Sequence, residues 1–252
     1  MIWPYALVLG LLIGSYLNVV IYRLPLGLST VRPASRCVTC EARIGARDNV
    51  PVLSYVLLRG RCRGCDTRIS PRYPIVEAST GFLFVGCLAK FGPTKEALVA
   101  ALFCSLMLAL ALIDLDHFIL PNELTYGGLV VGLLIQLVWP RTTFTAAVVG
   151  AVAGAAFILV VSGIWWLVRR VQGFGLGDAK MLAMMGAFLG VEGIAVTLFV
   201  ATMAGSLVGL FFIARRDLDM GSKLPFGSFL AVGGLLALFF GPEIVHWYLG
   251  FY

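Results

Sequence analysis

Residues 97–117 read ALVAALFCSLMLALALIDLDH, an apolar run that ends in two aspartates and a histidine. Its uncharged part, 97–113, has the length of a helix that crosses a bilayer, which needs about 17–25 residues. Further apolar stretches lie between charged residues at 1–22, 73–89 (interrupted only by Glu77), 124–140, 142–168, 181–191, 193–214 and 224–242. We therefore expect an all-α polytopic membrane protein with about eight transmembrane helices.

The composition excludes other classes of protein. Apolar residues make up 60% of the chain and charged residues 13%, against roughly 45–50% and 25% in soluble domains. The mean hydropathy is +0.96. Such a chain is neither a soluble globular protein, nor a disordered tail, nor a secreted disulfide-rich miniprotein. Its apolar runs are also too long for the alternating strands of an outer-membrane barrel.

The basic residues predict the orientation in the membrane. If all eight stretches cross, the loops 23–72, 114–123, 169–180 and 215–223 share one side and hold 16 of the 19 Lys and Arg residues. The positive-inside rule then places the large first loop in the cytoplasm and both termini outside. It also favours a crossing at 181–191, although that stretch is short. The net charge of +6 reflects this topology and contact with anionic membrane lipids, and we expect no nucleic acid partner.

Four cysteines predict a metal site in the first loop. They form two pairs, Cys37-Val-Thr-Cys40 and Cys62-Arg-Gly-Cys65, separated by 21 residues. This spacing is typical of a tetrahedral Cys₄ zinc site, which would be structural because four thiolates leave no open position. Two disulfides are the alternative, and a reducing cytoplasm argues against them. The other two cysteines, Cys87 and Cys104, lie in apolar stretches and are interpreted as small packing residues.

The chain therefore divides into three parts. Residues 1–22 form the first transmembrane helix, and 23–72 form a small cytoplasmic zinc-binding loop domain. Residues 73–252 form a transmembrane core with about seven helices. A loop of this size has little hydrophobic core, so a metal would supply most of its folding free energy.

Ionisable residues at the edge of the membrane are the candidates for function. Asp114 ends its apolar run, and Asp178 follows the glycine-rich segment 173–177. Both are predicted at the cytoplasmic ends of different helices, where two carboxylates can face each other. One would keep a proton while the other acts as a base, which is what the activation of a water requires. Gly175 and Gly177 would allow close approach of backbone and substrate.

Other polar residues are rivals or supports for this pair. Asp116 follows Asp114 by two residues, which is about 200° of helical rotation, so the two cannot share a face. His117 can share a face with Asp114. Lys180 follows Asp178 by two residues. Glu77 is expected to cap its helix or to pair with a nearby arginine.

Several ordered motifs resemble one known family. They are GSYLNVVIYRLP at 14–25, the two CxxC pairs, PVLSY at 51–55, LRGRC at 58–62, RYPIVE at 72–77, IDLDH at 113–117 and GLGDAK at 175–180. Together they resemble the type IV prepilin peptidases, which are bifunctional leader peptidases and N-methyltransferases. One departure is Leu120-Pro121-Asn122, where the family often has an aspartate in third place.

The resemblance implies an intramembrane aspartic protease of the GxGD type in the bacterial inner membrane. Its active site would face the cytoplasm, with Asp114 and Asp178 as the catalytic pair. Its substrates would be type IV prepilins or pseudopilins, cleaved after the final glycine of the leader. The new N-terminal amine would then be methylated with S-adenosylmethionine.

Two other interpretations remain open. The chain could be an ion-coupled transporter with an aspartate relay, or a zinc-bearing secretion scaffold without activity. Transporter sites lie near the bilayer midplane and often accompany internal repeats, whereas these acids lie at the edge and the two halves show no repeat. A scaffold would not need an aspartate after the glycine-rich segment.

Overall fold

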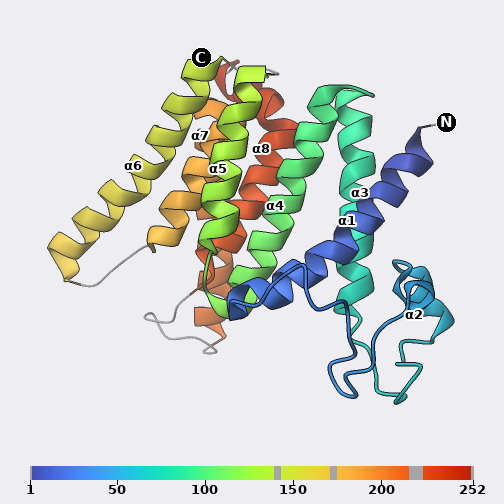
Figure 1. Ribbon diagram of the computed structural model, residues 1–252. Coiled ribbons are helices and arrows are strands. Elements are labelled where there is room, and N and C mark those ends of the chain that lie inside the picture. Colours follow the sequence, from blue (N-terminus) through green and yellow to red (C-terminus); the bar gives the residue numbers. More distant parts are fainter. Residues whose placement is uncertain (1, 139–142, 171–174, 216–223, 251–252) are drawn as a thin grey trace. The chain divides into compact units, whose positions relative to one another are not determined.

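A computed structural model describes residues 2–138, 143–170, 175–215 and 224–250. Regular structure in these ranges is helical, apart from two isolated β-bridges. The elements in chain order are α1 (Trp3–Arg23), η1 (Leu24–Leu26), η2 (Ala46–Asn49), α2 (Leu53–Leu57), α3 (Arg72–Phe91), α4 (Lys95–His117), α5 (Asn122–Val138), α6 (Phe144–Arg169), α7 (Leu176–Ala214) and α8 (Phe226–Leu249), as labelled in Figure 1.

The helices confirm the expected fold class, an all-α multi-pass membrane protein with a four-cysteine loop. Six of the described helices are long and apolar enough to cross a membrane: α1, α3, α4, α6, α7 and α8. The apolar helix α5 has 17 residues. Helix α7 contains both of the stretches expected at 181–191 and 193–214, and its backbone is non-helical at Gly190, with φ 70° and ψ −173°. Glycine adopts this positive φ without steric cost, so the helical path is interrupted inside α7.

The chain forms two compact units, 1–105 and 106–252, and their boundary falls inside α4. In the first unit α1 packs on α3 through glycines. A Cβ atom at Gly10 would lie 2.7 Å from the Cα of Gly81, and one at Gly14 would lie 2.7 Å from the Cα of Glu77. Small residues allow helix backbones in a membrane to approach this closely. The Nδ2 of Asn18 also donates to the carbonyl of Tyr73 at 3.1 Å.

In the second unit the first half of α7 is the buried centre. Met181, Leu182, Met184 and Met185 are completely buried. Helices α5, α6 and α8 all pack against α7. Each of these contacts includes a glycine whose added Cβ would meet α7 at 2.5–2.8 Å: Gly132 against the Phe188 ring, Gly150 and Gly154 against carbonyl oxygens, and Gly233 against the carbonyl of Thr197.

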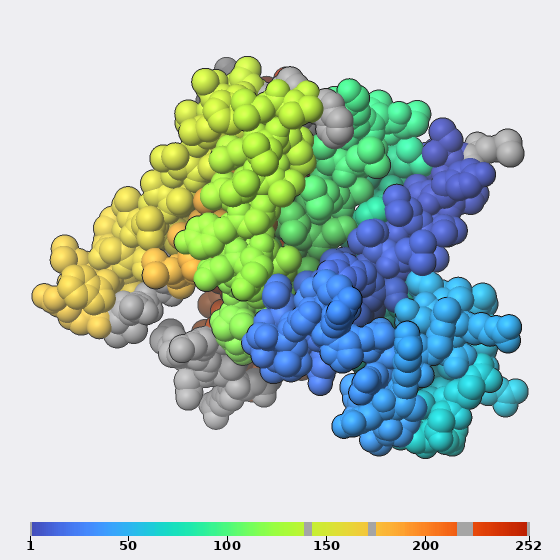
Figure 2. All heavy atoms as spheres, in the orientation of Figure 1, coloured from blue at the N-terminus to red at the C-terminus, as the bar shows by residue number. Residues whose placement is uncertain are grey.

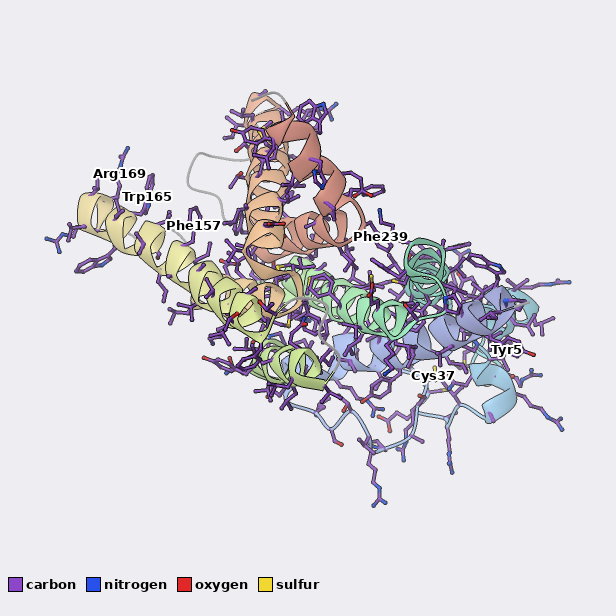
Figure 3. All side chains as sticks on the ribbon, turned by 90° about the horizontal axis from the view of Figure 1, so that it is seen from above. Tyr5, Cys37, Phe157, Trp165, Arg169 and Phe239 are labelled. Atoms are coloured by element: carbon purple, nitrogen blue, oxygen red, sulfur yellow. The ribbon has the colours of Figure 1, made fainter. Side chains whose placement is uncertain are left out.

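Large apolar side chains cover the outer surfaces of the helices, as expected for surfaces that face lipid. In Figure 2 the atoms of α6, in yellow, lie open to the viewer along one edge. Near the end of this helix Trp165 and Arg169 lie together, with the guanidinium 5.7 Å from the ring centroid (Figure 3). Arg170 lies similarly over Trp166, at 5.0 Å. Tryptophan and arginine at a helix end are typical of the membrane–water interface.

Two glycines of α6 provide a test of the close packing between α6 and α7. Gly150→Ala should lower the melting temperature, because its Cβ would lie 2.7 Å from the carbonyl oxygen of Gly186, a backbone atom that cannot move aside. We expect a loss of about 1–3 kcal/mol, as for other overpacked sites. The matched control is Gly163→Ala in the same helix, where nothing lies within 4 Å. It should gain up to about 1 kcal/mol of helix propensity. Equal melting temperatures for the two variants would contradict this packing.

Candidate active site and metal centre

Asp114 lies in the last turn of α4 and is only 5% exposed. Its Oδ2 accepts the backbone N–H of Ser228 at 2.9 Å and lies 3.3 Å from the Ser228 hydroxyl. Ser228 is in the first turn of α8. The N-terminal end of a helix favours a negative charge because its N–H groups lack partners within the helix. The start of α8 therefore offsets part of the cost of burying this carboxylate.

Asp178 has the same kind of environment at a different helix. It lies in the first turn of α7, is 8% exposed, and its Oδ2 accepts the N–H of Gly175 at 3.1 Å. Asp114 interacts with it electrostatically. Two buried carboxylates therefore lie near each other, and each is held through its Oδ2 at the start of a helix. The first two residues of the glycine-rich segment, Gly173 and Phe174, lie outside the described residues.

Leu120 lies beside both of these helix starts. A Cβ at Gly177 would be 3.2 Å from the Cβ of Leu120, and a Cβ at Gly227 would be 3.1 Å from its Cδ1. A Cβ at Gly227 would also lie 2.9 Å from the Asp114 carboxylate. Glycine at these positions thus allows an apolar side chain to pack next to the two acids. Sequence reasoning missed Leu120, Gly227 and Ser228, although Pro225 at the beginning of an apolar run is a helix-start signal that could have pointed to the region.

The other candidates of the second unit lie on the surface. Asp116 and His117 are exposed at the end of α4. The Nζ of Lys180 donates to the Oδ1 of Asn122 at 2.7 Å and lies 5.3 Å from the centroid of the Tyr126 ring. Lys180 thus joins the start of α7 to the start of α5.

Glu77 connects α3 to the cysteine loop. It is 8% exposed, and its Oε2 accepts the backbone N–H of Val52 at 2.7 Å. This interaction differs from the expected ones, in which Glu77 would cap its own helix or pair with an arginine. Val52 has a positive φ of 60°, which is unfavourable for a β-branched residue. The carboxylate therefore helps to hold the loop in this conformation against α3.

The four loop cysteines form a cluster that could hold a metal ion. Their Sγ atoms all lie within 4.8 Å of one another, and those of Cys37 and Cys65 are 3.8 Å apart. Four thiolates about 2.3 Å from one zinc ion, as in tetrahedral sites, would be about 3.8 Å from one another. The donor set and its spacing therefore fit a tetrahedral metal site.

The two halves of the cluster are repeats of one turn. The pattern Arg-Cys-x-x-Cys-acid-x-Arg-Ile occurs at 36–44 and again at 61–69. In each copy the first cysteine N–H donates to a carbonyl five residues later, that of Ala42 at 3.0 Å or Thr67 at 2.9 Å. The two arginines of each copy form an isolated antiparallel β-bridge, Arg36 with Arg43 and Arg61 with Arg68. Sequence reasoning missed this short repeat, which is visible once the residues that flank the cysteines are aligned.

The thiols of the cluster differ in their pKa values. Backbone N–H groups of Cys40 and Thr39 lower the pKa of Cys37 to about 6. The pKa of Cys40 is raised to about 11, because hydrogen bonds with the thiols of Cys65 and Cys37 outweigh the opposing effect of the Ala42 backbone. Four neighbouring thiolates repel one another, so a cation is needed for all four to be ionised together.

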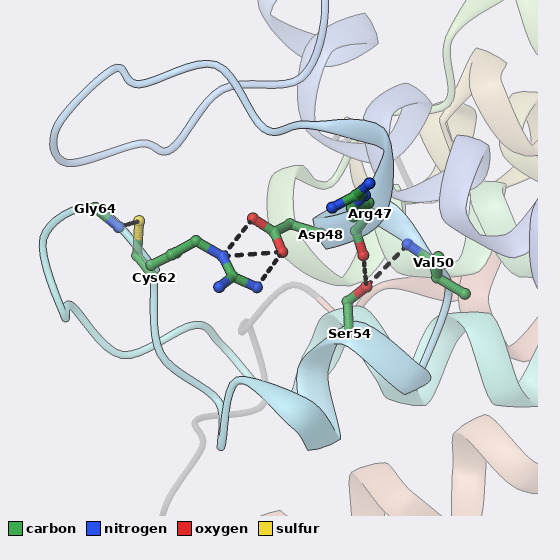
Figure 4. A network of polar contacts seen from close by, with 7 residues as sticks. Arg47, Asp48, Val50, Ser54, Cys62 and Gly64 are labelled. Atoms are coloured by element: carbon green, nitrogen blue, oxygen red, sulfur yellow. Dashed lines mark hydrogen bonds and ion pairs between the residues drawn. The ribbon is translucent and has the colours of Figure 1, made fainter.

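A polar network supports the second turn of the cluster (Figure 4). Arg63 forms a bidentate contact with Asp48, at 2.7 Å and 2.9 Å, and its hydrogen bonds lower the pKa of that carboxyl. The hydroxyl of Ser54 donates to the carbonyl of Arg47 at 3.0 Å and accepts the N–H of Val50 at 2.9 Å. Side chains thus tie the CxxC segment to η2 and α2.

Sequence comparison identifies the family. Residues 8–91 match the bacterial peptidase A24 N-terminal domain, and residues 101–210 match the type IV leader peptidase family. The chain belongs to the type IV leader peptidase family. Its relatives include proteins named prepilin leader peptidase/N-methyltransferase from Burkholderia pseudomallei strain 1026b and from Pseudomonas putida. Each is 40% identical, over 94% and 95% of this chain and 85% and 91% of theirs.

A relative of the same name from Myxococcus xanthus is 42% identical over 83% of this chain and 62% of its own length. No solved structure matches the chain significantly. Membership in the type IV leader peptidase family confirms the resemblance seen in the motifs, and with it an enzyme that combines leader peptidase and N-methyltransferase activities. It favours the peptidase over the transporter and the scaffold.

Proposed function

We propose that this member of the family cleaves the basic leader from a type IV prepilin or pseudopilin by a GxGD aspartic mechanism, with Asp114 and Asp178 as the catalytic pair. The observation that carries the proposal is the pair of buried carboxylates, Asp178 in the first turn of α7 and Asp114 held by the first turn of α8. It is supported by the names of the relatives, which are prepilin leader peptidases.

The two oxygen atoms of each carboxylate have different roles in this proposal. In both aspartates Oδ2 accepts a helix N–H, which leaves Oδ1 for the reaction. The ionised aspartate takes a proton from a water as that water attacks the scissile carbonyl carbon. The protonated aspartate donates its proton to the carbonyl oxygen. Collapse of the tetrahedral intermediate then breaks the C–N bond: the amine leaves with the proton of the first aspartate, and the second aspartate takes back a proton from a hydroxyl of the intermediate, which leaves the new carboxyl group.

The pair needs little else from its surroundings. Glycine at 177 and 227 lets the backbone of α7 and α8 lie close to the pair, and Leu120 places an apolar side chain beside both positions. A lower local dielectric strengthens the interaction of both carboxylates with the reacting atoms. Lys180, Asp116, His117 and Glu77 are then supporting residues.

Zinc and the methyl donor complete the proposal. Cys37, Cys40, Cys62 and Cys65 would hold one structural Zn²⁺, since four thiolates leave no position for a substrate. S-adenosylmethionine would supply the methyl group for the new N-terminal amine, in line with the N-methyltransferase in the names of the relatives. Methyl transfer to an amine needs no activated water, so it should not depend on the two aspartates.

The peptidase proposal has a direct test. Purified protein and a prepilin with its leader are mixed, and the substrate is followed by mass spectrometry. The expected result is a loss of mass equal to the leader, followed by the gain of one methyl group when S-adenosylmethionine is added. An intact substrate, with the enzyme correctly inserted in a bilayer, would contradict the proposal.

The proposed location is the bacterial inner membrane, with the active site facing the cytoplasm. One cysteine is added to the parent protein, at either Glu96 or Arg215, both exposed, and whole cells are treated with an impermeant maleimide to test this orientation. Glu96→Cys should be labelled from outside and Arg215→Cys should not, because the basic loops are retained in the cytoplasm. The parent protein, whose loop cysteines should also be protected, is the control. Labelling at position 215 would mean that 181–191 does not cross.

A further inference from the structure

Among the residues that the structure describes, more donors hold Asp114 than Asp178. Around Asp114, Ser228 provides its N–H at 2.9 Å and its hydroxyl at 3.3 Å, both to Oδ2. The N–H of Gly227 interacts favourably with the same carboxylate. Around Asp178 the corresponding donor is the N–H of Gly175 at 3.1 Å. Donors favour the ionised form of a carboxylate, so the two sites are not equivalent.

The hydroxyl of Ser228 is held in place for this role. Ser228 is only 8% exposed, and its Oγ also donates to the carbonyl oxygen of Ala111 at 2.9 Å. Ala111 and Asp114 lie in the same turn of α4. The hydroxyl proton therefore has two acceptors on one helix, and an ionised carboxylate is the stronger of them.

The other described titratable and charged groups on the neighbouring helices are exposed or engaged by another residue. From α4, Asp116 and His117 are exposed. From α5, Glu123 and Tyr126 are exposed, and from α7, Lys180 is engaged by Asn122. The first turn of α8 has no acidic residue. Among the described residues, Asp178 is therefore the buried charged neighbour of Asp114.

We propose that Ser228 is a positioning residue that keeps Asp114 as the ionised member of the pair, so that Asp114 is the general base and Asp178 carries the proton. This proposal rests on the proposed function, because it assigns the roles within that catalytic pair. It assigns to Ser228 an effect on protonation, and not only on packing.

The proposal makes a specific demand on the pH dependence of kcat/KM. For an aspartic pair, kcat/KM rises with pH along an acid limb, where the doubly protonated pair loses its first proton and becomes active. It falls along an alkaline limb, where the pair loses its second proton. If Asp114 is the ionised member, the Ser228 hydroxyl stabilises both the active and the fully ionised forms. Its removal then shifts only the acid limb, to higher pH. If Asp178 were the ionised member, the same change would shift only the alkaline limb.

The decisive variant is Ser228→Ala, which removes the hydroxyl and keeps the backbone N–H. We expect its acid limb to move up by about one pH unit, since a hydrogen bond to a charged group is worth about a ten-fold preference or more. Activity at low pH should fall by about ten-fold, with the alkaline limb unchanged. Ser228→Thr retains a hydroxyl and should restore the wild-type acid limb.

A matched control is Ser105→Ala in α4. Its hydroxyl is also buried and donates to a carbonyl four residues earlier, that of Ala101 at 2.9 Å, and it should leave both limbs unchanged. The reciprocal variant is Gly175→Pro, which removes the donor to Asp178. Its φ of −77° suits proline, and this variant should move the alkaline limb instead.

The outcomes separate the two proposals. Asp114→Asn is measured first, and substantial cleavage by that variant would overturn the catalytic pair and the role of Ser228 with it. If Asp114→Asn is inactive but Ser228→Ala shifts neither limb, the catalytic pair stands and the role of Ser228 is wrong. A shift of the alkaline limb alone in Ser228→Ala would assign the proton to Asp114 and overturn the proposal in the same way. Circular dichroism and melting temperature establish that each variant is folded.

Discussion

Asparagine in place of Asp114 or Asp178 should reduce leader cleavage by about 100- to 10,000-fold, the range that general acid–base catalysis contributes. Asparagine keeps the size of the side chain and most of its hydrogen bonds, but it cannot take up or release the proton. Initial rates of cleavage of a purified prepilin, with enzyme in detergent or nanodiscs, measure the effect.

The double variant tells whether the two residues act together. Because the reaction needs the base and the acid at the same time, the loss of both should be scarcely worse than the loss of either. Multiplicative losses would mean that the residues act independently.

Asp116→Asn is the matched control for this series. It makes the same chemical change two residues from Asp114, on a side chain that is exposed, and should cause a much smaller loss. Methylation of a substrate that has already been cleaved should survive in Asp114→Asn and Asp178→Asn. Cleavage near the wild-type rate by Asp178→Asn, in a protein that inserts normally, would refute the aspartic mechanism.

Loss of the metal should have the second largest effect, on the folding of the loop. Metal analysis of the purified protein should find about one zinc per chain, and almost none after Cys37→Ser and Cys62→Ser are combined. These two changes remove one thiolate from each turn of the cluster. Structural zinc contributes about 10–16 kcal/mol to the folding of small metal-dependent units, so the loop should become sensitive to proteases.

The control for this experiment is Cys87→Ser, at a buried cysteine in α3 outside the cluster. It should keep both the zinc and the resistance of the loop. A zinc-free wild-type protein whose loop resists proteases equally well would show that the cluster does not need a metal.

Local patterns in the sequence were sufficient for the class of fold and for the cysteine cluster. Apolar runs that exceed the thickness of the hydrocarbon core predict membrane helices, because unpaired backbone groups are too costly in lipid. CxxC spacing predicts clustered thiols for a similarly local reason, since each turn brings its own two cysteines together. The described residues include both: six helices of membrane length and four Sγ atoms within 4.8 Å of one another.

The sequence also indicated which acids to consider, because charge at the end of an apolar run is expensive. It could not predict what holds them. Ser228 and Asp114 are 114 residues apart, and Glu77 meets Val52 across 25 residues. No local periodicity encodes such a pairing.

Only the tertiary structure decides these contacts, for a physical reason. The start of α8 reaches Asp114 because helices in this unit approach closely where glycines replace larger side chains, as at Gly150, Gly227 and Gly233. The break in α7 at Gly190 has a similar origin, since a glycine permits a positive φ but does not require it. The sequence by itself determined which segments are helices in a membrane and which side chains carry chemistry, whereas packing of one helix end against another determined which donors hold those side chains.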